Sequence, residues 1–374
     1  MAEKPGPIKR TYLPQLVAWE TTRRCQLRCS HCRASAKDVR YEGELTTDEG
    51  KRLLDNIASF SKPIIILTGG EPLMRSDIFE LSSYGDKLGL PMALATCGIG
   101  LTKEIALKFK ESGVRRMSLS IDGSTAETHD RFRNVPGAFN TALKAAEIAK
   151  SVGLPFQINT TVSRINVDDL PAILKLAVDI GAAAFHPFLL VPVGRGKALE
   201  SETLDPEKYE AILSWIAEEQ ARSPIPFKPT CAPHFHRIIR QKKLYKPPGG
   251  HGHPGSGHPG SGHPGAGHPG GLDTLSRGCL GGLGFVFISH VGQVQICGFL
   301  EESAGNVREA NVDFKKIWET SPLFLEMRDR KRYKGRCGVC GFWNVCGGCR
   351  ARAQSMKGHY MEEEPNCLYQ PGGF

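Results

Sequence analysis

The chain alternates short apolar runs with amphipathic stretches from about residue 12 to residue 200. The apolar runs are hydrophobic on both faces, which is typical of buried parallel strands. Six of them are predicted as strands, at 16–20, 63–68, 92–96, 116–121, 156–162 and 184–191.

Helical periodicity separates these runs. Thr46 and Glu49 have the spacing of a capping box, and the apolar residues that follow share one helical face. Further helices are predicted within 102–113, 138–153 and 167–181. Six strand–helix units in sequence predict an α/β fold, a partial TIM-type (β/α)6 barrel with its chemistry in the loops that follow the strands.

The pattern divides the chain into three predicted regions. Residues 1–200 form the partial barrel, and residues 201–276 form a bridging helical segment. That segment contains a repeat at 250–271 that is rich in Gly and Pro and holds five of the twelve histidines. We expect a flexible insertion, either a solvated loop or a metal-storage tract. Residues 277–374 contain seven cysteines and are predicted to be a second, cysteine-built domain.

Composition narrows the class of protein. The chain has 374 residues, 40% of them hydrophobic, and no apolar run approaches the roughly 20 residues of a membrane span. The N-terminus lacks the apolar region of a signal peptide, so a cytoplasmic, reducing location is expected. Twelve cysteines in such a location indicate metal or redox chemistry. The net charge of +9 fits an acidic small molecule better than nucleic acid, because no basic run is interleaved with aromatic residues.

Three of the cysteines lie within eight residues. Cys25, Cys29 and Cys32 have the spacing C-x3-C-x2-C directly after the first predicted strand. A structural zinc site usually takes four protein ligands, whereas a [4Fe–4S] cluster held by three thiolates keeps one iron free for a small molecule. The alternatives are a distorted zinc site and thiols without a function.

The motif CQLRCSHC, followed by TGGEP after the next strand, resembles the radical S-adenosylmethionine (SAM) superfamily. The resemblance implies that Cys25, Cys29 and Cys32 are the catalytic cysteines that hold a [4Fe–4S] cluster. It also implies that SAM binds the free iron and is split by one electron into methionine and a deoxyadenosyl radical. The cofactors would supply the chemistry, and the barrel would orient them and exclude water.

The resemblance also assigns cofactor-binding positions. Gly69, Gly70 and Glu71 correspond to the turn that takes the methionine ammonium. Val191 lies in the segment that lines the adenine, and His31 takes the position of an aromatic residue against the adenine.

Polar residues at the ends of later strands complete the predicted cofactor site. By resemblance Ser120 and Asp122 would bond the ribose hydroxyls, and Asn159 the carboxylate or the ribose. The alternative for each is ordinary loop hydrogen bonding. Cys97 stands where Asn is common in the family, and we expect a small buried residue there, not a ligand.

The C-terminal cysteines resemble the SPASM extension, which houses auxiliary iron–sulfur clusters. The resemblance implies two auxiliary [4Fe–4S] clusters, one held by Cys337, Cys340, Cys346 and Cys367 and the other by Cys279, Cys297 and Cys349 with its fourth ligand unassigned. Two residues separate Cys346 from Cys349 where three are usual, which leaves the partition in doubt. A redox-silent zinc site is the alternative. Cys231 lies outside both sets and either completes the three-thiolate set, contacts substrate or is idle.

Longer strings, among them HPFLLVPVGRGK and TCAPHFHRIIRQ, resemble the heme b synthase family of the siroheme-dependent pathway. That family converts the iron-porphyrin substrate Fe-coproporphyrin III to heme b by decarboxylating two propionates to vinyls, and a ferredoxin or flavodoxin is the expected electron donor. Guanidinium groups bind carboxylates bidentately. The candidate propionate clamps, each of which could also be a surface arginine, are Arg195, Arg237, Arg240, Arg350 and Arg352.

Several alternatives remain open. A ligand role toward the substrate iron and a structural role are both open for His234, His236 and His290. The nearest alternative functions are a didecarboxysiroheme deacetylase and a heme d1 maturase. A peptide-modifying SPASM maturase and a non-catalytic iron or nickel binder are more distant. No stable membrane insertion is expected.

Overall fold

The computed structural model describes residues 12–244, 278–309 and 313–372. The repeat at 250–271 lies outside these residues. Within them every predicted strand is present, with small shifts at the ends. The six parallel strands are β1 Leu16–Thr22, β2 Ile64–Gly69, β3 Met92–Thr96, β4 Val114–Ser120, β5 Phe156–Val162 and β6 Ala184–Leu189.

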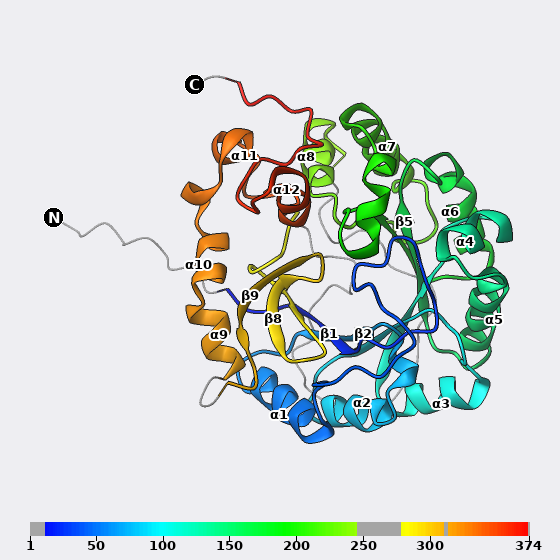
Figure 1. Cartoon of the computed structure of the whole chain (residues 1–374). Helices are drawn as coiled ribbons and strands as arrows, with labels where there is room; N and C mark the ends of the chain where they lie inside the picture. The colour runs from blue at the N-terminus through cyan, green and yellow to red at the C-terminus, as the bar shows by residue number, and fades with distance from the viewer. Residues whose placement is uncertain (1–11, 245–277, 310–312, 373–374) are drawn as a thin grey trace, which may run out of the picture.

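Each of these strands pairs in parallel with the next, so sequence order equals spatial order from β1 to β6. Figure 1 shows helices around the outside of this curved sheet. They are α1 Thr47–Ala58, α2 Ile78–Lys87, α3 Lys103–Glu111, α4 Ala126–Arg133, α5 Ala138–Ser151 and α6 Leu170–Asp179. The arrangement confirms the partial (β/α)6 barrel.

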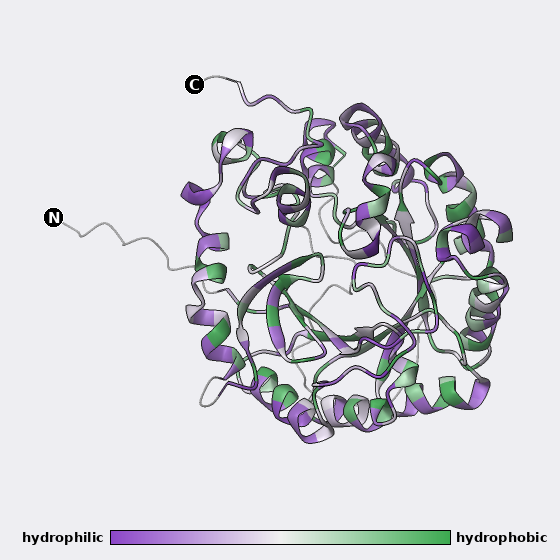
Figure 2. Cartoon of the chain, viewed as in Figure 1, coloured by the Kyte–Doolittle hydropathy of each residue, from purple (hydrophilic) through white to green (hydrophobic). Residues whose placement is uncertain are grey.

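Local sequence explains how the helices begin. Thr46 accepts a hydrogen bond from the backbone of Glu49, whose side chain accepts one from the backbone of Thr46, so the predicted capping box is present. Leu53, Leu54 and Ile57 of α1 are buried. Figure 2 shows the outer helices with hydrophobic and hydrophilic sides, as expected for helices that cover a buried sheet.

The C-terminal region continues the barrel sheet. Strand β7, Phe285–Ile288, pairs in parallel with β1, and two antiparallel strands follow it, β8 Gln293–Cys297 and β9 Leu300–Asn306. The sheet therefore has nine strands in the order β6-β5-β4-β3-β2-β1-β7-β8-β9. The remaining helices of this region are α9 Phe314–Thr320, α10 Pro322–Arg328, α11 Gly335–Val339 and α12 Arg350–Lys357. The cysteine-rich part thus shares a sheet with the barrel, while the three domain boundaries remain predictions.

The other end of the sheet is extended by the bridging segment. After α7, Pro206–Glu219, the chain runs beside β6, with isolated parallel bridges from Phe185 to Phe227 and from Phe188 to Thr230. Helix α8, His234–Gln241, begins directly afterwards and packs against α7. None of the helices in the described ranges is both long and apolar enough to cross a membrane.

A buried arginine ties the C-terminal region to the barrel. Arg352 of α12 is fully buried and lies 3.3 Å from a carboxylate oxygen of Glu364. It also donates to the carbonyls of Leu189, Leu190 and Cys231, which belong to the β6 end of the sheet. Removing one partner of a buried ion pair costs stability, because the other charge stays buried without compensation.

We expect Arg352→Met to destabilise the fold by about 3–5 kcal/mol, because Glu364 would stay buried without its charge partner. The measurement is thermal unfolding of anaerobic protein followed by circular dichroism. Arg164→Met is the matched control, because Arg164 pairs with Asp205 on the surface, where such pairs contribute about 0–1 kcal/mol. Equal stability of the two variants would contradict the structural role of Arg352.

Candidate functional site

A large cavity opens at the C-terminal ends of the parallel strands. It encloses about 1140 Å³ when the open solvent at its mouth is included. Cys25, Cys29 and Cys32 all line it, at the barrel face where this fold carries its chemistry.

Hydrogen bonds from distant segments hold the cysteine loop. The backbone N–H of Cys25 donates to Lys37, and that of Cys32 donates to Cys29. Arg195 donates from Nε to the carbonyl of Cys29 at 2.8 Å and from Nη1 to that of Ala36 at 2.6 Å. The loop has little secondary structure of its own, so these contacts determine how the three thiols are presented.

The predicted glycine-rich turn packs directly against the start of this loop. A Cβ atom on Gly69 would lie 2.2 Å from the Thr22 carbonyl oxygen, and one on Gly70 would lie 2.3 Å from that of Arg24. Both glycines line the cavity. Only glycine permits this close approach of two backbones.

Glu71 does not line the cavity. Its carboxylate is fully buried and accepts hydrogen bonds from the Thr96 hydroxyl, the Cys97 backbone and the Leu73 backbone. Burial raises the pKa of Glu71. The carboxylate thereby joins the turns after β2 and β3, and its role in binding the methionine ammonium stays a prediction.

Among the predicted strand residues, Ser120, Asn159 and Val191 line the cavity. Ser120 and Asn159 are register partners on β4 and β5, which explains why they meet. Asp122 does not line it, since its carboxylate accepts from the Thr161 backbone at 2.7 Å and lies 2.6 Å from Arg133 Nε. These contacts give the carboxylate a supporting role, and its contact with a ribose stays a prediction.

Arg133 is a cavity residue that sequence reasoning missed. It ends helix α4, pairs with Asp122 and directs Nη1 to within 3.6 Å of the Cys29 sulfur. Burial acts to raise the pKa of Asp122, but the charge of Arg133 and the hydrogen bond from the Thr161 backbone help to outweigh it and lower the pKa. No motif marks Arg133, because only the fold brings α4 beside the cysteine loop.

His31 lies where the resemblance expects an aromatic residue. Its ring lines the cavity and stacks on Phe132 with 4.5 Å between ring centroids. Burial lowers the pKa of His31 to about 4, so the ring is neutral near pH 7. A neutral stacked imidazole can lie against a purine face.

The cysteine loop fits an iron–sulfur cluster better than a single metal ion. Among the described residues no three His, Cys, Asp or Glu side chains are close enough to hold one metal ion together. Because the Zn–S bond is about 2.3 Å long, the sulfur atoms of thiolates on one zinc would lie about 3.8 Å apart. In a cluster each thiolate binds a different iron. Two buried nitrogen atoms, Arg195 Nη2 and His31 Nδ1, have no hydrogen-bond partner within the described ranges. They are available to bind a ligand.

Comparison with known proteins decides the family. The profile of the Radical SAM superfamily matches residues 19–177. The AdoMet-dependent heme synthase of Methanosarcina barkeri is 47% identical over 98% of this chain and 99% of that protein. The chain belongs to the radical SAM superfamily. A second AdoMet-dependent heme synthase, from Oleidesulfovibrio alaskensis, is 46% identical over 96% of this chain and 88% of its own length.

More distant comparisons agree with this assignment. The Fe-coproporphyrin III synthase of Methanosarcina barkeri is 32% identical over 94% of this chain and 87% of that protein. The crystal structure of Streptococcus suis SuiB bound to S-adenosylmethionine shares the fold, with a TM-score of 0.72 at 15% identity over 96% of this chain and 78% of that one. The protein is thus a radical SAM enzyme of the heme synthase family with a cysteine-rich C-terminal region, and its family implies SAM and a [4Fe–4S] cluster.

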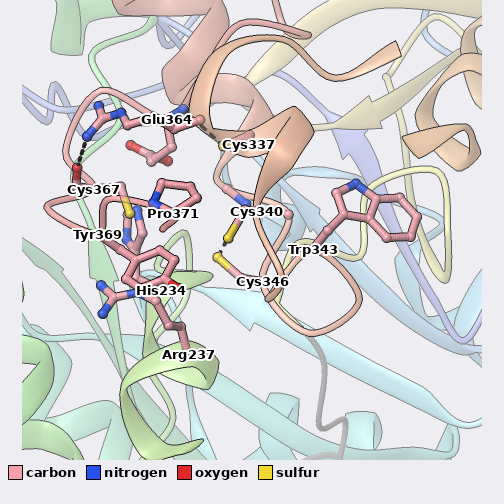
Figure 3. Close-up of a pocket in the computed structure, with 13 residues that line it drawn as sticks. His234, Arg237, Cys337, Cys340, Trp343, Cys346, Glu364, Cys367, Tyr369 and Pro371 are labelled. Atoms are coloured by element: carbon pink, nitrogen blue, oxygen red, sulfur yellow. Dashed lines mark hydrogen bonds between the residues drawn. The ribbon is translucent and has the colours of Figure 1, made fainter. Parts of the chain in front are cut away.

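A second cavity in this radical SAM enzyme brings together one predicted auxiliary set. Its volume is about 410 Å³, and its lining includes Cys337, Cys340, Cys346 and Cys367. Figure 3 shows these four side chains around one pocket, which His234 reaches from α8. Twenty-nine residues separate the first and last of these cysteines, so their convergence is a property of the fold.

The other predicted set also converges. The thiol of Cys349 lies near those of Cys279 and Cys297, and burial raises the pKa of both Cys279 and Cys297. Cys349 differs, because a hydrogen bond with the Cys231 thiol lowers its pKa to about 7. Cys231, which the sequence left unassigned, therefore lies beside this set.

Three of the five predicted propionate clamps are engaged by protein acceptors. Arg350 and Arg352 are buried, and Arg350 donates to the carbonyls of Tyr360 and Glu362. Arg237 is paired with Glu210 on α7 and lines the second cavity. Arg195 lines the large cavity. The propionate contacts of these arginines stay predictions.

The predicted histidines differ in their surroundings. His290 has a structural role, because its Nδ1 lies 2.8 Å from a carboxylate oxygen of Glu20. His234 lines the second cavity, and neither ring nitrogen finds a hydrogen-bond partner in the described part of the chain. Burial lowers the pKa of His234 and of His236 to about 4.

Glu20 connects the end of β1 with the cysteine loop and the C-terminal region. Its buried carboxylate contacts Arg23, Arg33 and His290. Burial acts to raise the pKa of Glu20, but the hydrogen bond with His290 and the charges of Arg33 and Arg23 outweigh it and lower the pKa to about 2. The charged form is therefore favoured in the folded state.

We expect Glu20→Gln to lower the unfolding free energy by on the order of 3 kcal/mol at pH 7. The folded pKa of about 2 lies below the ordinary 4.5, so this contribution is complete above pH 4.5 and is lost as the pH falls toward about 2. Denaturant unfolding of cluster-free protein across this range measures it.

The matched control is Glu80→Gln, which removes an exposed partner of Lys51. Its stability difference from the parent protein should be small at every pH. A Glu20→Gln difference that does not shrink on acidification would contradict the assignment.

Proposed function

We propose that this enzyme decarboxylates two propionate side chains of Fe-coproporphyrin III to vinyl groups and so produces heme b. In each conversion –CH2–CH2–COO⁻ becomes –CH=CH2 with loss of carbon dioxide, one hydrogen atom and one electron. The observation that carries the proposal is the 47% identity, over almost the full chain, to a protein named AdoMet-dependent heme synthase. A 32% identical relative is named for the synthesis of Fe-coproporphyrin III, the substrate proposed here, which supports an iron porphyrin as the ligand.

The cofactor site is proposed to be the large cavity. Cys25, Cys29 and Cys32 would hold the [4Fe–4S] cluster, which together with SAM supplies one-electron cleavage of the sulfonium when both are bound. Ser120 and Asn159 line the opposite wall with polar atoms suited to ribose hydroxyls. The close packing of Gly69 and Gly70 keeps the end of β2 against the start of the cysteine loop.

The chain also offers groups for the acidic parts of its ligands. Two nitrogen atoms of Arg195 donate hydrogen bonds to the cysteine loop, and its Nη2 has no partner within the described ranges. Arg33 lines the same cavity, and its guanidinium lies 4.3 Å from the Phe287 ring centroid. We propose that these two arginines, which both line the large cavity, are carboxylate contacts at its mouth.

Two auxiliary [4Fe–4S] clusters are proposed in the C-terminal region. Cys337, Cys340, Cys346 and Cys367 would hold one of them in the second cavity. Cys279, Cys297 and Cys349 would contribute to the other. Each decarboxylation releases one electron, and a cluster within the protein could accept it. The proposed external donor that begins the reaction is a ferredoxin or flavodoxin.

The cysteine assignment predicts that Cys29 and Cys97, which both line the large cavity, differ in their effect on the bound iron. We expect Cys29→Ala to lose the iron of the cavity cluster and to abolish SAM cleavage, since two thiolates cannot hold the cluster in this geometry. Cys97→Ala should keep that iron, although the Cys97 thiol hydrogen bonds to Cys25. Iron content and electron paramagnetic resonance after anaerobic reconstitution measure the difference. Cleavage of SAM by Cys29→Ala would refute the assignment.

The substrate is tested by anaerobic incubation of reconstituted enzyme with Fe-coproporphyrin III, SAM and dithionite. We expect heme b, preceded by a mono-vinyl intermediate, in chromatography with mass detection. Deoxyadenosine without change of the porphyrin would keep the radical SAM chemistry and reject this substrate. In that case the related iron tetrapyrroles, those of a didecarboxysiroheme deacetylase or a heme d1 maturase, are the next substrates to assay.

A further inference from the structure

Four thiols gather where the sequence assigned only three. The Cys231 thiol hydrogen bonds to that of Cys349 and lies near that of Cys297. Cys349 in turn lies near both Cys279 and Cys297. The remaining C-terminal cysteines line their own cavity, so eight thiols form two groups of four.

The fold brings Cys231 to this place from the far end of the sheet. Residues 226–230 run beside β6, with backbone hydrogen bonds from Phe185 to Pro226 and from Thr230 to Pro187. Cys231 follows at once, whereas Cys297 ends β8 beyond β1 at the other end of the same sheet. The four cysteines thus come from both ends of the open barrel.

The backbone of Cys231 is held in an unusual conformation. Its φ of 56° lies in the left-handed region, which residues other than Gly seldom adopt. Its carbonyl accepts hydrogen bonds from the Tyr209 hydroxyl at 2.9 Å and from Arg352 at 3.0 Å. A rare backbone conformation held by two buried side chains indicates that the direction of this thiol is determined by the structure.

An idle thiol accounts poorly for this arrangement. An idle cysteine is usually packed as a small apolar residue without polar contacts, whereas the Cys231 thiol hydrogen bonds to that of Cys349 and lies near that of Cys297. A single zinc ion is also disfavoured, because no three ligands within the described ranges are close enough to share one ion. Four thiols that converge without meeting at one point suit a cluster, in which each iron takes its own thiolate.

We propose that Cys231 is the fourth thiolate ligand of the auxiliary cluster held by Cys279, Cys297 and Cys349. The inference rests on the proposed auxiliary clusters and is independent of the porphyrin substrate. With four protein ligands this cluster keeps no iron free for substrate, so its role is electron transfer. It also joins the two ends of the barrel sheet.

The test uses full-length protein in which Cys25, Cys29 and Cys32 are all Ala, so that only auxiliary clusters remain. Cys231→Ala and Cys231→Ser are added separately, and Cys97→Ala is the matched control. Each protein is reconstituted anaerobically, and iron, sulfide, Mössbauer and electron paramagnetic resonance spectra are recorded. Circular dichroism reports the fold.

We expect Cys231→Ala to lose the iron of one cluster, or to give a three-iron signal after oxidation, while the Cys97→Ala control matches the parent. Cys231→Ser should keep the cluster with changed g values, because a hydroxyl oxygen replaces one sulfur ligand. If Cys231→Ala does not fold, the spectrum of Cys231→Ser decides. Spectra and iron content equal to the parent in both Cys231 variants would overturn the proposal, as would a parent with iron for one auxiliary cluster alone. No porphyrin is present, so a wrong substrate assignment would not affect the result.

Discussion

The arrangement of the active site depends on how an irregular loop of thiols is held rigid. The cysteine loop has few hydrogen bonds within itself, and a free loop of this length would pay a large entropic cost for ordering three ligands. Arg195 offsets this cost by donating to two of the loop's carbonyls, Cys29 and Ala36. The adjacent Gly194 has a φ of +56°, and a Cβ atom there would lie 2.2 Å from the Arg33 carbonyl oxygen. The segment after β6 therefore acts as a clamp on the loop after β1, across the mouth of the barrel.

Buried charges connect the barrel to the cysteine-rich region in the same way. Glu20 at the end of β1 contacts His290 in the turn after β7. Arg352 on α12 contacts the β6 end of the sheet. Each of these groups is desolvated, and each has its partners only when both regions are in place. Such contacts specify one relative arrangement of the regions.

Much of the fold could be predicted from local patterns. All six parallel strands appear within a few residues of their predicted positions, because a strand that is apolar on both faces has few other stable environments. The capping box at Thr46 and Glu49 was also predictable, since its interactions span only three residues. The pairing of β7 with β1 was not predictable, because it joins segments more than 260 residues apart. Neither short sequence indicates which other strand it pairs with.

The sequence by itself determined the kind of chemistry. Residue type and spacing alone identify the three closely spaced thiols, the glycine-rich turn and the C-terminal cysteines. Only the tertiary structure decided which charged residues face the cavity. Glu71, Asp122, Arg350 and Arg352 are turned into the protein, while Arg133 and Arg33 reach the cavity lining. It also decided that Cys231 lies beside Cys349. The physical reason is that burial and charge pairing depend on which distant segments meet, whereas ligand chemistry belongs to the side chain itself.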